Sequence, residues 1–427
     1  MFDELLVVDP GAGEAALVAR IEALERLKSA AAAAQARAAV AFASVRRGAE
    51  EAAGVAARRR GRGVAAEIAL ARRDSPARGG RHLGLANALV HEMPHTLAAL
   101  ESGVLSEWRA TLIVRESACL DIEDRRALDA ELCADPKQLE GLGDRRIAAE
   151  ARAIAYRLDP HAVVDRAARA ERERTVTIRP APDCMTYLTA LLPMARGVSV
   201  YAALKRAADT CGDGRGRGQV MADTLVERVT GRAAADPTPV AVNLVLSDES
   251  LLAGSNTPAT VPGYGPIPAA VARQLISAAA RDPRSRASLR RLYQHPRSGA
   301  LVAMESRSRL FPAGLAGFIA LRDQTCRTPY CGAPIRHTDH ATPAARGGPT
   351  SAANGEGLCA ACNYTKENPG WTVAARTGPE GTHTATLTTP TGATHHSTAP
   401  PVTGTPRRYK ASTLEIDIGI SLATHAA

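Results

Sequence analysis

The chain has 427 residues, of which 45% are hydrophobic and only 3% aromatic, and its formal net charge is +9. This length allows two or three domains with sizeable cores. No stretch has the length of a membrane span without charges, and the start carries no signal or lipidation motif, so we expect a cytoplasmic protein without a membrane partner. The positive charge fits a polyanionic partner without proving one.

The first 173 residues have the pattern of an α-helical domain. Leu17, Ile21 and Leu24 recur along one face of the first predicted helix, and alanine-rich turns follow. Further amphipathic stretches are interrupted by helix breakers such as Pro94. The alanine runs could also form a coiled coil, but no heptad repeat is sustained. We therefore predict packed helices over this region.

Residues 174–300 are predicted to form a small α+β unit that continues the helical region. Thr175–Ile178 and Val240–Leu246 have the pattern of strands, and Met185–Ala195 and Tyr201–Thr210 between them have the pattern of helices. The glycine-rich stretch Gly212–Gly218 lacks the lysine of a P-loop and no strand leads into it, so we predict a flexible basic connector.

Two arginine clusters carry much of the positive charge. One lies between Arg58 and Arg81, and the other runs from Arg284 to Arg297. Such clusters attract nucleic-acid phosphates without regard to base sequence. They are equally typical of solvated helix faces and loops, and both interpretations stay open.

Two closely spaced pairs of cysteines are the least accidental feature of the chain. Four residues separate Cys326 from Cys331, and two residues separate Cys359 from Cys362. This spacing is typical of the knuckles that wrap a tetrahedral structural Zn²⁺. Disulfides or free thiols are the alternatives, although nothing indicates an oxidising compartment. The remaining cysteines are scattered without ligand spacing.

Asp339, His340 and Asn354 lie between these pairs, and Asn363 follows the last cysteine directly. With these four residues the chain resembles the HNH endonucleases and their ββα-metal finger. The resemblance implies that Asp339 holds a divalent cation and that His340 is the general base. It further implies that Asn354 orients the finger loop or the base, and that Asn363 completes the metal site. An asparagine oxygen in place of an imidazole favours a hard ion, Mg²⁺ or Mn²⁺.

The same residues fit the chemistry of phosphodiester hydrolysis. His340 is a natural proton acceptor near neutral pH, and a cation at Asp339 and Asn363 would stabilise the leaving oxygen. Arg346 and Lys366 are candidate phosphate contacts, and each is equally readily an ordinary solvated charge. A finger of about fifty residues is too small to be stable on its core alone, which explains a structural metal beside the active residues.

The whole layout resembles a large actinobacterial family in which a mainly helical domain of unknown function precedes an HNH finger. The motifs that carry this resemblance are His95–Ala110, Gln219–Gly231, Val261–Pro268 and the Pro-Gly-Trp sequence at Pro369–Trp371. Many relatives end the second knuckle in two histidines, whereas this chain has Cys362-Asn363. That departure favours a four-cysteine zinc site and leaves the efficiency of the catalytic metal site open.

We therefore predict a mainly α N-terminal domain with a small α+β unit, followed by a zinc-braced ββα-metal finger. The predicted boundaries are 1–173, 174–300, 301–375 for the finger and 376–427 for a low-complexity, mobile tail with at most one hairpin near Gly392. The predicted function is metal-dependent hydrolysis of DNA, with RNA left open as a substrate. The alternative is a nucleic-acid-binding zinc module without catalysis, a regulator or mobile-element accessory. The sequence leaves the oligomeric state open.

Overall fold

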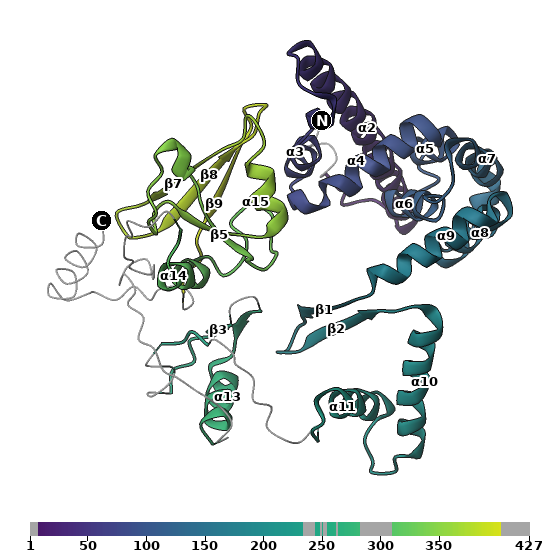
Figure 1. Cartoon of the computed structure of the whole chain (residues 1–427). Helices are drawn as coiled ribbons and strands as arrows, with labels where there is room; N and C mark the ends of the chain where they lie inside the picture. The colour runs from purple at the N-terminus through teal and green to yellow at the C-terminus, as the bar shows by residue number, and fades with distance from the viewer. Residues whose placement is uncertain are drawn as a thin grey trace. The chain divides into compact units, whose positions relative to one another are not determined.

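A computed structural model describes residues 7–233, 244–247, 250, 254–261, 264–281 and 310–402. The chain divides into two compact units, Met1–Arg169 and Ala170–Ala427 (Figure 1). The arginine cluster at Arg284–Arg297 and the end of the chain from residue 403 lie outside the described residues. Among the described residues, no helix is both long and apolar enough to cross a membrane.

Helices form the whole regular structure of the first unit over its described residues, which confirms the predicted helical domain. The longer helices are α2 (Glu14–Ala52), α3 (Val64–Ala71), α4 (Gly79–Asn87), α5 (Pro94–Glu101), α6 (Glu107–Glu116), α7 (Ile122–Cys133), α8 (Asp144–Leu158) and α9 (Pro160–Ala170). The short helical turns are η1 (Ala57–Arg59), η2 (Pro76–Arg78), η3 (Ala88–Glu92) and η4 (Pro136–Leu139).

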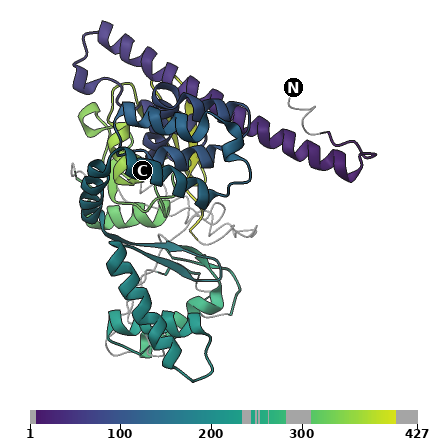
Figure 2. The same ribbon diagram turned by 90° about the vertical axis from the view of Figure 1, so that its right-hand side faces the viewer.

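Helix α2 contributes to the core through alanine. Ala33, Ala36 and Ala43 are buried against a cluster that includes residues of α4 and α5, because small side chains let neighbouring helices approach closely. The apolar face in the first half of α2 is exposed instead, with 37% of Leu17 and 67% of Ile21 accessible. Figure 2 shows this half of α2 extending beyond the other helices of its unit.

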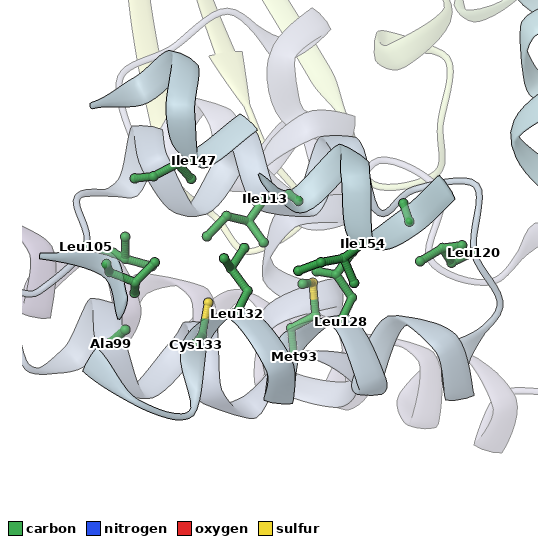
Figure 3. Packing of buried hydrophobic residues seen from close by; sticks show 13 residues of the cluster. Met93, Ala99, Leu105, Ile113, Leu120, Leu128, Leu132, Cys133, Ile147 and Ile154 are labelled. Carbon is green, nitrogen blue, oxygen red and sulfur yellow. The ribbon is translucent and has the colours of Figure 1, made fainter. Parts of the chain in front are cut away.

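A second core joins α5, α6, α7 and α8. Figure 3 shows its buried side chains, among them Met93, Leu105, Ile113, Leu128 and Ile147, all with no accessible surface. Burial on this scale, at roughly 1.5–3 kcal/mol per large apolar side chain, is what offsets the entropy lost on ordering the chain.

The motif at His95–Ala110 is explained by this packing. The buried carboxylate of Asp129 accepts hydrogen bonds from the backbone N–H groups of His95 (2.7 Å) and Thr96 (2.8 Å), and so caps the start of α5. The Ser106 hydroxyl caps α6 in the same way, accepting from Arg109 N. Gly103 has a positive φ of 81°, and a Cβ there would lie 2.6 Å from the Arg26 side chain. The motif therefore has a structural reason in this unit.

The second unit begins with an α+β region, as predicted. Its elements are η5 (Glu171–Glu173), β1 (Thr175–Pro180), β2 (Thr186–Leu191), α10 (Met194–Thr210), α11 (Arg217–Thr230), β3 (Ala259–Val261), β4 (Gly265–Ile267) and α13 (Ala269–Arg281). Strand β1 pairs antiparallel with β2, and β3 with β4. Of the strand predicted at Val240–Leu246, residues 240–243 lie outside the described residues, and Val245 forms an isolated bridge with Thr260.

The helix predicted at Met185–Ala195 is wrong for most of its length. Thr186–Leu191 is strand β2, in register with β1 from Thr175↔Leu191 to Pro180↔Thr186. Helix α10 begins only after Pro193, which stands at its N-cap position. The backbone pairing to β1 decides the conformation here, and local sequence pattern does not reveal that partner.

The finger and a C-terminal sheet complete the second unit. Their elements are α14 (Ala313–Asp323), β5 (His337–His340), η6 (Ala344–Arg346), β6 (Gly355–Leu358), α15 (Ala360–Lys366), β7 (Thr372–Thr377), β8 (His383–Thr388) and β9 (Thr394–Thr398). Strands β5 and β6 form one antiparallel pair, and β7, β8 and β9 form a three-stranded sheet (Figure 1).

This sheet corrects the expected tail. The hairpin predicted near Gly392 is present, with Gly392 at φ 83° between β8 and β9. The strands continue to Thr398, where we expected a mobile segment. Strand β8 buries His383, Ala385 and Leu387 on one face in strict alternation, and the many threonines that read as low complexity are β-branched strand formers.

The sheet is fastened to the finger by buried polar contacts. The Arg327 guanidinium donates to the carbonyl oxygens of His383 (3.4 Å) and Ser397 (3.2 Å). His383 Nε2 lies 3.0 Å from the carbonyl oxygen of Ala353, in the turn that leads into β6. The sheet therefore supports the loop that carries Asn354.

The buried position of His383 predicts an acid-sensitive fold. Burial lowers its pKa from 6.5 to about 3, so below pH 6.5 the unfolded chain binds a proton that the folded chain does not. The contribution of His383 to stability should therefore fall as the pH drops from 6.5 towards 3, and between pH 7.5 and 5.5 this contribution to the unfolding free energy should decrease by about 1.4 kcal/mol. Urea unfolding at both pH values measures this loss. The change in unfolding free energy between the two pH values should differ between His383→Gln and the unmodified chain by about 1.4 kcal/mol, whereas replacing the exposed His396 with Gln should leave the pH dependence of the unmodified chain unchanged. An identical pH dependence in His383→Gln and the unmodified chain contradicts the assignment.

Candidate active site and metal-binding cluster

The site is built on a β-hairpin followed by a helix. Strands β5 and β6 pair antiparallel, with Asp339 opposite Glu356 and His340 opposite Gly355, and α15 follows directly after Cys359. Both glycines of β6 are required by close packing: a Cβ would lie 2.4 Å from Ile319 at Gly355 and 2.5 Å from Ile335 at Gly357. This arrangement confirms the predicted ββα finger.

The four predicted cysteines come together. Cys326, Cys331, Cys359 and Cys362 are buried, their Sγ atoms all lie within 4.8 Å of one another, and none forms a disulfide. Cys331 Sγ is 3.9 Å from Cys359 Sγ, close to the separation of about 3.8 Å expected of thiolates at the corners of a tetrahedron around zinc. The neighbouring Cys331 thiol and burial raise the pKa of Cys326 to about 12. A cation at the centre of the cluster would lower the pKa again, because it stabilises the thiolates.

Asp339 and Lys366 form a close ion pair. The Nζ atom of Lys366, on α15, lies 2.8 Å from the Oδ2 atom of Asp339, on β5. Burial acts to raise the pKa of Asp339, but hydrogen bonding and the charge of Lys366 outweigh it, and the net pKa is lowered. The carboxylate is therefore ionised at neutral pH, and the Lys366 ammonium is paired with it.

His340 is held in a fixed orientation. Its Nε2 atom lies 2.8 Å from Thr350 Oγ1, and its Nδ1 atom lies 3.8 Å from Asp339 Oδ1. The ring packs on Phe311 with a centroid separation of 4.6 Å, and only 7% of the residue is exposed. Burial lowers the pKa of His340 below 6.5 despite the nearby Asp339 carboxylate. The imidazole is therefore neutral at pH 7, the form in which it accepts a proton.

Asn354 fastens the loop between the two strands. Its Oδ1 accepts from Thr342 N (2.9 Å), and its Nδ2 donates to the carbonyl oxygens of Thr342 (3.0 Å) and Pro349 (2.9 Å). Gly348 passes so close that a Cβ would lie 2.8 Å from this Nδ2. Asn354 thus orients the loop that carries Thr350 and, through it, the His340 ring.

Replacing Asn354 with aspartate should destabilise the finger without changing the side-chain volume. A carboxylate cannot donate to two carbonyl oxygens, and the site is 8% exposed, so we expect a loss of about 3 kcal/mol. Urea unfolding followed through the fluorescence of the buried Trp371 measures it. The matched control is Asn368→Asp, because Asn368 is half-buried and its side-chain amide donates to one carbonyl oxygen, that of Thr365; an equal loss in the control would contradict this role for Asn354.

Asn363 supplies the signal that a ligand is missing. Its Oδ1 atom is buried and has no hydrogen-bond partner among the described residues. Asn363 and Lys366 are three positions apart on α15 and therefore share one side of the helix, the side from which Lys366 reaches Asp339. An unpartnered amide oxygen on the side of α15 that faces a carboxylate offers the oxygen ligands that suit Mg²⁺ or Mn²⁺. Arg346, at the end of η6, is exposed.

The sequence did not reveal the buried charges beneath the hairpin. Asp323 accepts from Arg322 Nε (2.7 Å) and from Gly357 N (2.8 Å), and Arg322 Nη2 donates to Gly355 O (2.7 Å). Arg327 lies in the same cluster, and burial raises the pKa of Glu356 to about 7. The adjacent Arg322-Asp323 step just before the first knuckle was the available signal. Through these hydrogen bonds the buried charges fix strand β6, and with it the hairpin that carries the site.

Comparisons with known families agree with this geometry. The profile of the HNH endonucleases matches residues 326–369, so the hairpin, helix and cysteines form a domain of that nuclease family. The profile of a domain of unknown function, DUF222, matches residues 21–323, more than half of the chain. The chain belongs to this DUF222 family, with an HNH endonuclease domain following, as the resemblance implied. No curated protein and no solved structure matches it.

Proposed function

We propose that this protein is a metal-dependent endonuclease that hydrolyses phosphodiester bonds in DNA. The observation that carries the proposal is the contact of Lys366 with the Asp339-His340 step, with Asn363 three positions before Lys366 on the same helix. Asp339 and His340 come from the end of β5, and Asn363 and Lys366 from one side of α15. A binding module has no need of an acid beside a neutral, oriented base.

The divalent ion, Mg²⁺ or Mn²⁺, would be held by Asp339 and Asn363. Such an ion supplies Lewis-acid stabilisation of the phosphate and the leaving oxygen. The fit rests on the ionised Asp339 carboxylate and the orphaned Asn363 Oδ1. The four cysteines are proposed to hold a separate structural Zn²⁺ that joins the loop before β5 to the start of α15.

His340 is proposed to take the proton from the attacking water. We assign the ring proton to Nε2, which donates to Thr350 Oγ1, so that the lone pair of Nδ1 lies on the side of Asp339. The hydrogen bond to Thr350 and the contact with Phe311 fix the ring, which reduces the reorganisation needed at the moment of transfer. Hydrolysis then leaves the proton on His340.

The alternative function is nucleic-acid binding without catalysis. The observation that favours it is the low accessibility of the site, in which Lys366 is paired with Asp339 and only 7% of His340 is exposed.

We also propose that the protein is cytoplasmic. In that compartment the four buried cysteines, which form no disulfide, can bind zinc without being oxidised.

Cleavage of supercoiled plasmid by the purified full chain tests the proposal. With Mg²⁺ or Mn²⁺ the plasmid should be nicked or linearised, and a chelator that removes the ion should prevent it. Single-stranded DNA and RNA of the same sequence, run alongside, decide between nucleic acids. Binding of DNA without cleavage under any of these ions would reject the nuclease in favour of the binding module.

A further inference from the structure

The Lys366 side chain is unusually placed for a lysine. Its Nζ atom contacts Asp339 Oδ2 (2.8 Å), Glu367 Oε1 (2.8 Å) and the carbonyl oxygen of His340 (3.0 Å), and only 6% of the side chain is exposed. The ammonium therefore lies against the carboxylate that the proposed function gives to the catalytic ion. A divalent ion on the same carboxylate would place a second positive charge within a few ångströms of this ammonium, and the two charges would repel at that separation.

We propose that Lys366 is a displaceable counter-ion: it neutralises Asp339 in the metal-free protein and is released towards a substrate phosphate when the divalent ion binds. This inference rests on the proposed function, since it assumes that Asp339 is a metal ligand. Lys366 would then contact Asp339 before the ion binds and a substrate phosphate afterwards. The phosphate contact would form only when the ion is bound.

The geometry around Lys366 permits the exchange. Asn363 Oδ1 is already buried without a partner on the same side of α15, so an ion gains that ligand without breaking another bond. The Glu367 carboxylate, more than half exposed, stays beside the released ammonium and keeps it near the site. The four-carbon stem of lysine lets the charge move by several ångströms with little backbone change.

Competition at Asp339 also sets the metal affinity. Removing the ammonium leaves an uncompensated carboxylate, so Lys366→Met should bind Mn²⁺ about tenfold more tightly than the unmodified chain, the size of effect expected of one nearby charge in a partly solvated site. Titration calorimetry on the zinc-loaded full chain measures this affinity. Asp339→Asn should abolish the binding, and Lys137→Met, at an exposed lysine of the first unit, should not change it.

Lysine reactivity separates displacement from a general effect of charge. In the metal-free chain an amine acylating reagent should label Lys366 slowly, and saturating Mg²⁺ should increase its labelling at least several-fold, as read by peptide mass spectrometry. Lys28, Lys137 and Lys205 serve as internal controls whose labelling should not respond to the ion. In Asp339→Asn, Lys366 should be reactive with or without Mg²⁺.

The outcomes discriminate between this inference and the proposed function. If Mn²⁺ binds in an Asp339-dependent way but Lys366 remains equally protected, the ammonium is a fixed structural charge and the inference is wrong, while the nuclease proposal stands. If no ion binds at Asp339 at all, the proposed function fails at its metal site, and the inference fails with it.

Discussion

Cys359→Ser should abolish zinc binding and unfold the finger. Four buried Sγ atoms within 4.8 Å of one another are placed so that they could bind one ion, and serine provides neither the charge nor the softness of a thiolate. Metal binding contributes roughly 10 kcal/mol or more to the folding of small zinc domains. The core near these cysteines is small, with Leu358 as its buried aliphatic member, so little else can replace that contribution.

Zinc content and Trp371 emission measure the effect together. The chain has two tryptophans, Trp108 in the first unit and the buried Trp371 in the second, so a Trp108→Phe background isolates the finger. Metal analysis should give one zinc per chain, and none for Cys359→Ser, whose Trp371 emission should shift to the red as the residue meets water. The control is Cys184→Ser, because Cys184 is exposed and lies outside the cluster.

Two results would reject the zinc site. One is a full zinc complement in Cys359→Ser. The other is a finger that unfolds with reductant but not with a zinc chelator, the response expected of disulfides. The same assay applies to Cys326, Cys331 and Cys362, since loss of any one ligand opens the tetrahedral site.

The spacing of residues in the sequence was enough to predict the cysteine cluster and the finger. The cysteines, Asp339-His340 and Asn363 are functional types at short, fixed separations, and a hairpin followed by a helix brings such residues together almost independently of the rest of the chain. The loop role of Asn354 also followed from the resemblance, and its three hydrogen bonds supply the reason.

Features that depend on distant contacts could not be predicted. Lys366 appears in the sequence as an ordinary charge, and only the approach of α15 to β5 buries it against Asp339. The strand at Thr186–Leu191 depends in the same way on pairing with β1, and the strands after residue 376 on packing against the finger loop. The sequence alone shows which residues are polar, but only the folded structure shows which of them are buried and paired.

His340→Ala should reduce plasmid cleavage by about 10²–10⁴-fold while leaving DNA binding unchanged. Loss of a general base typically has an effect of this size, and the side chain lies inside the site, where it adds no charge that would hold the nucleic acid. Removal of the buried ring also leaves a cavity beside Phe311, so zinc content and Trp371 emission must match those of the unmodified chain. His337→Ala is the control, because His337 lies on the same strand and contacts Tyr364 instead.

The pH dependence and chemical rescue distinguish a base from a structural residue. Because burial lowers the pKa of His340 below 6.5, the imidazole stays neutral to lower pH than a free histidine does. As the pH falls, cleavage should therefore decrease at a lower pH than it would with a base of the ordinary histidine pKa. Added imidazole should restore part of the activity of His340→Ala by entering the cavity, and it should not affect Asp339→Asn. Two results together would contradict the role of His340 as a base. In the first, His337→Ala loses as much activity as His340→Ala. In the second, imidazole does not rescue His340→Ala at any pH, and another group must then take the proton.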